Sequence, residues 1–226
     1  MLTRPKPETN PAARKLDAAS LARGTQWLIR RDRDLKRIVR RHGTPPLWDR
    51  PGGFRTLVQI VLEQQVSVAA GRAALKRIET RFGRVTAAVL AVAGPEDLRA
   101  AGITRQKAAY VAGLAAACKE GTLDLRRLAR LSDDEVRQAL TAHKGIGRWT
   151  ADVYLLMAMR RPDAWPPGDL ALQKALQWCK GLPDRPVGDE ELAIAAAWSP
   201  WRAVAARILW HGYLAERRRP PGTDTS

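Results

Sequence analysis

Apolar residues recur every three or four positions along most of the chain, which is the spacing that places them on one face of a helix. Stretches that alternate Val or Ile with polar residues, the pattern typical of strands, are absent. We therefore expect an all-α fold of about ten short helices. Two clear inward faces are Phe54, Leu57, Val58, Val61 and Leu62 in one expected helix and Ala70, Ala73, Leu75 and Ile78 in the next.

Capping residues and helix breakers mark where these helices begin and end. Ser20, Ser67 and Thr104 each stand where a side chain can cap a helix. Ser132-Asp-Asp-Glu135 has the spacing of a capping box, and Gly83 is expected to end the helix after Ser67. Further helices are expected over 35–41, 104–120, 149–159, 170–179 and 190–216, the last broken near Pro200.

The two ends of the chain differ from its middle. Residues 1–18 are rich in proline and charge, and residues 217–226 combine arginine, proline and small polar residues. Such composition cannot bury enough apolar surface to fold. We expect a loose N-terminal segment over 1–18, a helical domain over 19–216 and a disordered tail over 217–226, with 45% hydrophobic residues for the core.

Charge and cysteine content narrow the class of protein. The chain has 39 Lys and Arg against 23 Asp and Glu, a net charge of +16, which favours a polyanionic partner through counterion release. A basic protein without such a partner is the alternative. No apolar run could span a membrane, and the N-terminus lacks a secretory h-region. Cys118 and Cys179 are too few for a disulfide framework, a four-thiolate zinc site or an iron–sulfur cluster. We expect a cytoplasmic protein without a membrane partner.

A short glycine-containing turn, His143-Lys-Gly-Ile-Gly147, separates two expected helices in a hairpin over 136–158. Gly145 and Gly147 permit positive φ and close approach of a phosphate, and the backbone N–H groups that follow can bind an anion. Ile146 can plug the core beneath the turn. An ordinary corner between helices would also use two glycines, but the longer pattern and the net charge favour DNA. The expected DNA contacts here are His143, Lys144, Gly145, Ile146, Gly147 and Thr150.

A loop over 160–169 ends in Trp165-Pro-Pro-Gly-Asp169 and delivers one carboxylate. Asp169 stands where it can simply be the N-cap of the helix that starts at Leu170, the commonest role of Asp at such a position. A catalytic role is compatible with capping, because a helix start favours the charged form of a carboxylate.

Together with 54–67, 101–107 and 201–210, these two motifs make the chain resemble the helix-hairpin-helix DNA glycosylase superfamily, and within it the 3-methyladenine DNA glycosylase II family. The resemblance runs from about Trp27 to Tyr213. It implies two helical lobes with a cleft between them, and Asp169 as the catalytic residue. Cleavage of an N-glycosidic bond develops oxocarbenium character on the sugar. Asp169 would stabilise that charge and position or deprotonate the attacking water.

The resemblance also implies a mechanism without a covalent intermediate. Members that cut the strand carry a Lys two residues after the second hairpin glycine, and that position here is Trp149. Without that amine we expect a monofunctional glycosylase that uses water. No cofactor is expected, although Na⁺ or K⁺ could bind the backbone at Gly145 and Gly147. The N-terminal mixed domain of the better-known bacterial form is expected to be absent.

The target base must leave the duplex and enter a pocket. An alkylated purine is cationic, and electron-rich aromatic faces attract cations. Trp149 and Trp210 match aromatic pocket positions of the family, whereas a third falls on Val153 beside Tyr154, so the pocket set is Trp149, Trp210 and Tyr154. Core packing is the preferred interpretation for Trp27, Trp178, Trp198 and Trp201.

Gln64 and Gln65 stand at the end of the expected helix that precedes Ser67. Gln65 matches the family position whose side chain fills the gap left by the flipped nucleotide, and Gln64 beside it is also an expected DNA contact. Capping of local backbone groups explains both amides equally well. Arg105 and Lys107 are expected as surface charges near the DNA.

The expected activity is hydrolysis of 3-methyladenine, and also 7-methylguanine, from damaged double-stranded DNA by a monomeric enzyme, which leaves an abasic site. The alternatives are a glycosylase for another lesion, such as a deaminated or etheno purine or a mismatch, and a non-catalytic helix-hairpin-helix DNA-binding module.

Overall fold

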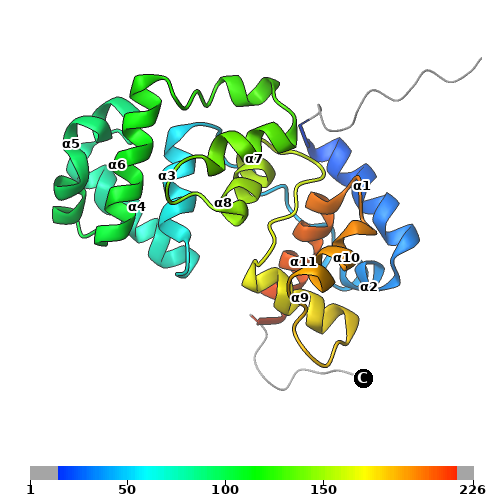
Figure 1. Ribbon diagram of the computed structural model, residues 1–226. Coiled ribbons are helices and arrows are strands. Elements are labelled where there is room, and N and C mark those ends of the chain that lie inside the picture. The colour runs from blue at the N-terminus through cyan, green and yellow to red at the C-terminus, as the bar shows by residue number, and fades with distance from the viewer. Residues whose placement is uncertain (1–14, 218–226) are drawn as a thin grey trace, which may run out of the picture. The chain divides into compact units, whose positions relative to one another are not determined.

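The computed structural model describes residues 15–217, and the chain is all-α as predicted (Figure 1). Within those residues there is no strand. The α-helices are α1 (Ala18–Arg31), α2 (Arg33–His42), α3 (Phe54–Glu63), α4 (Val68–Phe82), α5 (Ala87–Ala100), α6 (Arg105–Glu120), α7 (Asp133–Thr141), α8 (Arg148–Val153), α9 (Leu170–Lys180), α10 (Asp189–Ala196) and α11 (Arg202–Arg217). A 3-10 turn, η2 (Arg127–Arg130), and a π-helical turn, η3 (Tyr154–Ala158), complete the set.

The predicted capping residues are largely confirmed. Ser67, Thr104 and Ser132 accept backbone hydrogen bonds at the starts of α4, α6 and α7, and Ser132 and Glu135 form the predicted capping box. The first helix starts earlier than predicted because Asp17 is its N-cap, and Ser20 is the third residue of a capping box with it. Ordered helix therefore begins at Ala18, inside the segment predicted to be loose. Most of the two predicted loose ends, 1–14 and 218–226, lies outside the described residues.

The helices form two compact units, in agreement with the two expected lobes. The hairpin unit, residues 49–159, is built around α3, which contacts α4, α6 and α8 (Figure 1). Five of its apolar side chains are at most 1% exposed: Leu57, Val58, Ile60, Val61 and Leu62. Because seven of its ten residues are buried, α3 is the central helix of the hairpin unit.

The loop unit, residues 15–48 and 160–217, is built around α11, which packs on α1, α2 and α9. Residues 203–210 of this helix are buried in succession. They include Arg207, whose guanidinium donates to the carbonyl oxygens of Leu47 and Ala203. The loop that carries Asp169 belongs to this unit, so α11 and α9 position it.

Among the tryptophans assigned to core packing, two sites are informative. Trp198 is 2% exposed and donates from Nε1 to Asp32 at 2.8 Å, which confirms a buried role. Trp178 is 41% exposed, so the core interpretation is wrong there. It lies on α9 and partly covers Gly212 of α11, and only part of its ring is buried.

Candidate active site

The predicted hairpin is present between α7 and α8. The turn is closed by hydrogen bonds from His143 N–H to the Leu140 carbonyl and from Ile146 N–H to the His143 carbonyl. Ile146 is 5% exposed, so it plugs the core beneath the turn as predicted. Lys144 is exposed and His143 is half-buried. The outer rim of the turn thus carries a cationic side chain beside the backbone of α8.

The two hairpin glycines have different roles. Gly145 has φ of +90°, and a Cβ there would overlap the ring of Tyr110. Gly147 has φ of −94°, so the expectation of positive φ is wrong at this position. A Cβ at Gly147 would meet nothing within 4 Å, because its backbone faces open space at the start of α8. Close packing therefore requires glycine at Gly145, whereas Gly147 leaves the helix start uncovered.

Gln64 braces the hairpin from inside. Its Nε2 donates to the Gly145 carbonyl and to Thr150 Oγ1, both at 2.8 Å. Thr150 is 2% exposed, so its hydroxyl does not face solvent. The expectation that the Gln64 and Thr150 side chains contact DNA is therefore corrected, because the Gln64 amide and the Thr150 hydroxyl satisfy each other. Gln64 does not cap local backbone groups either, since its backbone acceptor is Gly145 in the hairpin.

Gln65 is the exposed member of the amide pair. It has φ of +55°, a left-handed conformation that costs a non-glycine residue about 1 kcal/mol or more. The turn is held by Lys107, whose Nζ donates to the carbonyls of Leu62 and Gln64 at 2.7 and 2.9 Å. Burial lowers the pKa of Lys107. Lys107 is therefore a cap on the end of α3, not the surface charge that the sequence suggested.

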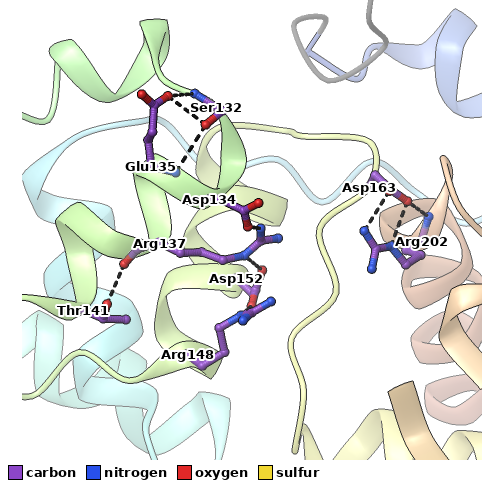
Figure 2. Close-up of polar contacts among 9 residues, drawn as sticks. All are labelled: Ser132, Asp134, Glu135, Arg137, Thr141, Arg148, Asp152, Asp163 and Arg202. Atoms are coloured by element: carbon purple, nitrogen blue, oxygen red, sulfur yellow. Dashed lines mark hydrogen bonds and ion pairs between the residues drawn. The ribbon is translucent and has the colours of Figure 1, made fainter. Parts of the chain in front are cut away.

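An ion cluster that sequence reasoning missed joins α7 to α8 (Figure 2). Asp152 is fully buried and accepts from Arg137 Nε at 2.8 Å and from Arg148 Nε at 2.6 Å. Burial works to lower the pKa of Arg137, but the carboxylates of Asp152, Asp134 and Asp133 together outweigh it and raise that pKa. The sequence signal for this cluster was Asp152, a carboxylate within the apolar stretch 149–159. We call Arg137, Arg148 and Asp152 the hairpin clamp.

Asp169 is the N-cap of α9, as one interpretation of the sequence required. Its Oδ1 accepts from the Leu172 backbone N–H at 2.9 Å and from Trp210 Nε1 at 3.2 Å. Trp210, predicted as a pocket aromatic, is 9% exposed and is thus tied to the carboxylate through its indole N–H. The carboxylate is half-buried and carries two donors on one oxygen, so its orientation is fixed.

The first half of the loop over 160–169 is anchored within its own unit. Asp163 accepts three hydrogen bonds from Arg202, the backbone N–H among them (Figure 2). It also accepts one from Ser199 Oγ at 2.9 Å. The Pro162 carbonyl accepts from Ala203 N–H at 3.0 Å. These anchors were missed because Asp163 and Arg202 are far apart in sequence. They tie the loop to the start of α11, the helix that carries Trp210.

The expected pocket aromatics do not share one environment. Trp149 is half-buried in α8 and belongs to the hairpin unit, whereas Trp210 belongs to the loop unit. Tyr154 is 2% exposed, its hydroxyl accepts from Gly53 N–H at 3.0 Å, and burial raises its pKa. Tyr154 is thus a core residue, and its assignment to a base pocket is wrong.

Two classes of site are not found in the described part of the chain. No group of three or more His, Cys, Asp and Glu side chains there could hold a metal ion. None of its helices is long and apolar enough to cross a membrane.

Comparison with known proteins gives a consistent result. A family model described as HhH-GPD superfamily base excision DNA repair protein matches residues 58–203. The structure of a Schizosaccharomyces pombe 3-methyladenine DNA glycosylase in complex with abasic DNA aligns with a TM-score of 0.75 at 26% identity, over 83% of this chain and 95% of that one. A Bacillus halodurans DNA-3-methyladenine glycosidase aligns at 0.71 and 30% identity, over 85% and 91%.

A curated relative from Bacillus subtilis, a DNA-3-methyladenine glycosylase, is 27% identical over 172 residues. The match covers 71% of this chain but 57% of that protein, so the chain spans less than two thirds of the relative's length.

Proposed function

Because the chain belongs to the HhH-GPD superfamily of base excision DNA repair proteins, we propose that it is a monofunctional DNA glycosylase that hydrolyses the N-glycosidic bond of alkylated purines. The relatives named above as 3-methyladenine DNA glycosylases support this substrate class. The single observation that carries the proposal is the fixed Asp169 carboxylate at the start of α9.

In the proposed reaction the bond between C1′ of the deoxyribose and the purine nitrogen breaks, and its electron pair leaves with the base. The cationic base becomes neutral, and positive charge develops on the sugar ring. The Asp169 carboxylate stabilises that charge, and then accepts the proton of the water that attacks C1′. The Leu172 and Trp210 N–H groups keep the carboxylate in place, so no reorganisation is needed during the reaction.

The identity of Trp149 supports the monofunctional assignment. The lyase members of the family need an amine at this position, and an indole cannot form a Schiff base. Trp149 instead offers an aromatic face on the first turn of α8, which suits a cationic purine. We therefore expect the product to be an abasic site with an intact strand.

The hairpin is the proposed grip on the DNA backbone. Helix α8 starts directly at the turn, where the Gly147 carbonyl accepts from Ala151 N–H at 3.1 Å. The positive end of this helix, beside the exposed Lys144, suits a phosphate. By contrast, the carbonyls of Gly145 and Gly147 already accept from Gln64 and Ala151. Each carbonyl oxygen keeps a second lone pair with which it could hold a Na⁺ or K⁺ ion, and no step of the reaction is routed through one.

The proposed partner is double-stranded DNA with damaged bases, and the enzyme is expected to act as a monomer in the cytoplasm, at the nucleoid if its source is bacterial. Light scattering should give the mass of one chain for the free protein, and the mass of one chain plus one duplex for the complex with DNA.

The test of the proposal is release of free bases from methylated duplex DNA by the purified protein. We expect 3-methyladenine, followed by 7-methylguanine, in the soluble fraction, with no strand break before alkali treatment. No release of methylated purine, with release from etheno, deaminated or mismatched substrates, would favour the alternative glycosylases. Binding without release of any base would favour a non-catalytic module. A borohydride-trapped adduct with abasic DNA would overturn the monofunctional assignment.

A further inference from the structure

A buried carboxylate outside the reacting centre holds the loop that carries Asp169. Glu191 lies in the first turn of α10 and is 1% exposed. Its Oε1 accepts from Trp165 Nε1 at 3.0 Å, and its Oε2 accepts from Gln173 Nε2 at 2.8 Å. The Gly168 backbone N–H lies 3.3 and 3.1 Å from the two oxygens.

Every one of these donors is a neutral group. Burying an ionised carboxylate is costly unless hydrogen bonds replace its hydration, and here they come from an indole, an amide and the backbone. All three donors belong to the loop or to the first turns of α9, on both sides of Asp169 in the chain. Glu191 therefore grips the segment around Asp169 without contacting it.

The Gly168 contact fixes the backbone that leads into Asp169. Pro167 and Gly168 occupy the two central positions of a turn closed by Asp169 N–H and the Pro166 carbonyl at 3.4 Å, and Gly168 has φ of +76°. Proline followed by glycine at these positions is the pattern of a type II turn. The N–H that Glu191 accepts belongs to the central peptide of that turn, so the carboxylate holds the peptide in one orientation.

On the other side, Gln173 stands one helical turn after Asp169, and its backbone N–H bonds the Asp169 carbonyl at 2.9 Å. Its side chain returns to Glu191. Glu191 thus accepts hydrogen bonds both from the turn before the N-cap Asp169 and from the first turn of α9 after it. A displacement of about 1 Å at a reacting group can cost about 100-fold in rate.

From this arrangement, and resting on the proposed function, we propose that Glu191 is a positioning residue for base release: it fixes the Asp169 loop in the geometry in which the carboxylate faces the developing sugar cation.

The test uses the full chain with Glu191→Gln, which keeps the shape but turns one acceptor oxygen into an N–H group that faces a donor. We expect single-turnover base release to fall by about 10- to 100-fold while affinity for duplex DNA with an uncleavable abasic analogue stays within about two-fold. Glu190→Gln, an exposed neighbour on the same helix turn, should behave as the unmodified protein.

A double-mutant cycle separates positioning from a purely structural effect. If Glu191 acts through Asp169, the single substitution Glu191→Gln should slow release. The same substitution added to the Asp169→Asn variant should then cause almost no further loss. Additive losses, or an unchanged rate, would overturn the inference. Should Glu191→Gln fail to fold, Trp165→Phe removes one donor and should give a smaller loss with the same non-additivity.

Failure of this inference and failure of the proposed function give different results. If the unmodified protein releases no methylated base, the proposed function fails and the inference fails with it. An active enzyme that Glu191→Gln leaves unchanged contradicts the inference alone.

Discussion

At the residue scale, one glycine of the hairpin is required by its surroundings and the other is not. Gly145 combines φ of +90° with contact to the face of Tyr110, so a side chain there meets both backbone strain and a steric clash. Gly147 has an ordinary φ and open space around its Cα. Substitutions of these two glycines therefore provide a matched comparison within one turn.

We predict that Gly145→Ala lowers the free energy of unfolding by more than about 1 kcal/mol, because the left-handed conformation and the Tyr110 ring both oppose a Cβ. Gly147→Ala should cost less than about 1 kcal/mol, since alanine is only a poorer N-cap. Urea unfolding followed by circular dichroism measures both. Equal losses at the two positions would contradict the account.

Residue roles could be predicted from sequence where they depend on near neighbours. The cap at Asp169 and the buried plug at Ile146 follow from adjacent residues, and both are confirmed. The roles of Gln64 and Tyr154 could not be predicted, because their partners Gly145 and Gly53 lie 81 and 101 positions away. A polar side chain at the end of an apolar helix looks the same in sequence whether it meets DNA or another turn.

At the element scale, the relation between α7 and α8 depends on the hairpin clamp. Asp152 is fully buried, and the Arg137 side chain is only 12% exposed. Removing Asp152 takes away the buried partner of the Arg137 guanidinium, which is then poorly compensated because the guanidinium itself is largely buried. Arg137 also meets Asp134 at 2.6 Å, but that carboxylate is 86% exposed and is well screened.

We predict that Asp152→Ala destabilises the protein by about 3 kcal/mol or more. Asp134→Ala, which removes the exposed partner of the same guanidinium, should cost about 1 kcal/mol or less. Thermal unfolding of both variants beside the unmodified protein provides the comparison. A larger loss for Asp134→Ala than for Asp152→Ala would show that the clamp does not hold the hairpin.

Helix positions were predictable because apolar periodicity and caps are local signals. The sequence did not predict α5, whose interior holds Gly94 and Pro95 and bends where Gly94 takes φ of +70°. It also predicted one regular helix over 149–159, whereas α8 passes into the π-helical turn η3 at Tyr154. The bend has a local cause, because Pro95 disfavours helical geometry at the residue before it and glycine accepts positive φ. The π-helical turn has no signature in the apolar periodicity.

At the scale of the whole molecule, the chain has a net charge of +16, and part of the positive charge is concentrated on helix α2. A hollow of about 590 Å³ on α2 is lined by Arg33, Lys36, Arg37, Arg40 and Arg41. Two of these make ion pairs, Arg37 with Asp34 and Arg41 with Glu216. Such an excess of positive charge favours any polyanion, so affinity for DNA should depend strongly on salt.

We predict that the logarithm of the association constant for undamaged duplex DNA falls linearly with the logarithm of salt concentration, with a slope steeper than about −3, which corresponds to about four phosphates or more. Fluorescence anisotropy between low and physiological salt gives the slope. A slope near zero would mean that phosphate contacts do not drive binding.

The central claim is that the charge of Asp169 drives base release, and one substitution isolates it. Asparagine is an equally good N-cap, and its Oδ1 can still accept from Leu172 and Trp210, so Asp169→Asn keeps the shape and removes the charge. Single-turnover release of 3-methyladenine from methylated duplex DNA should slow by about 100-fold or more, with affinity for an abasic analogue retained. Asp184→Asn, at an exposed carboxylate, serves as the control. Release by Asp169→Asn at the rate of the unmodified protein would contradict the account.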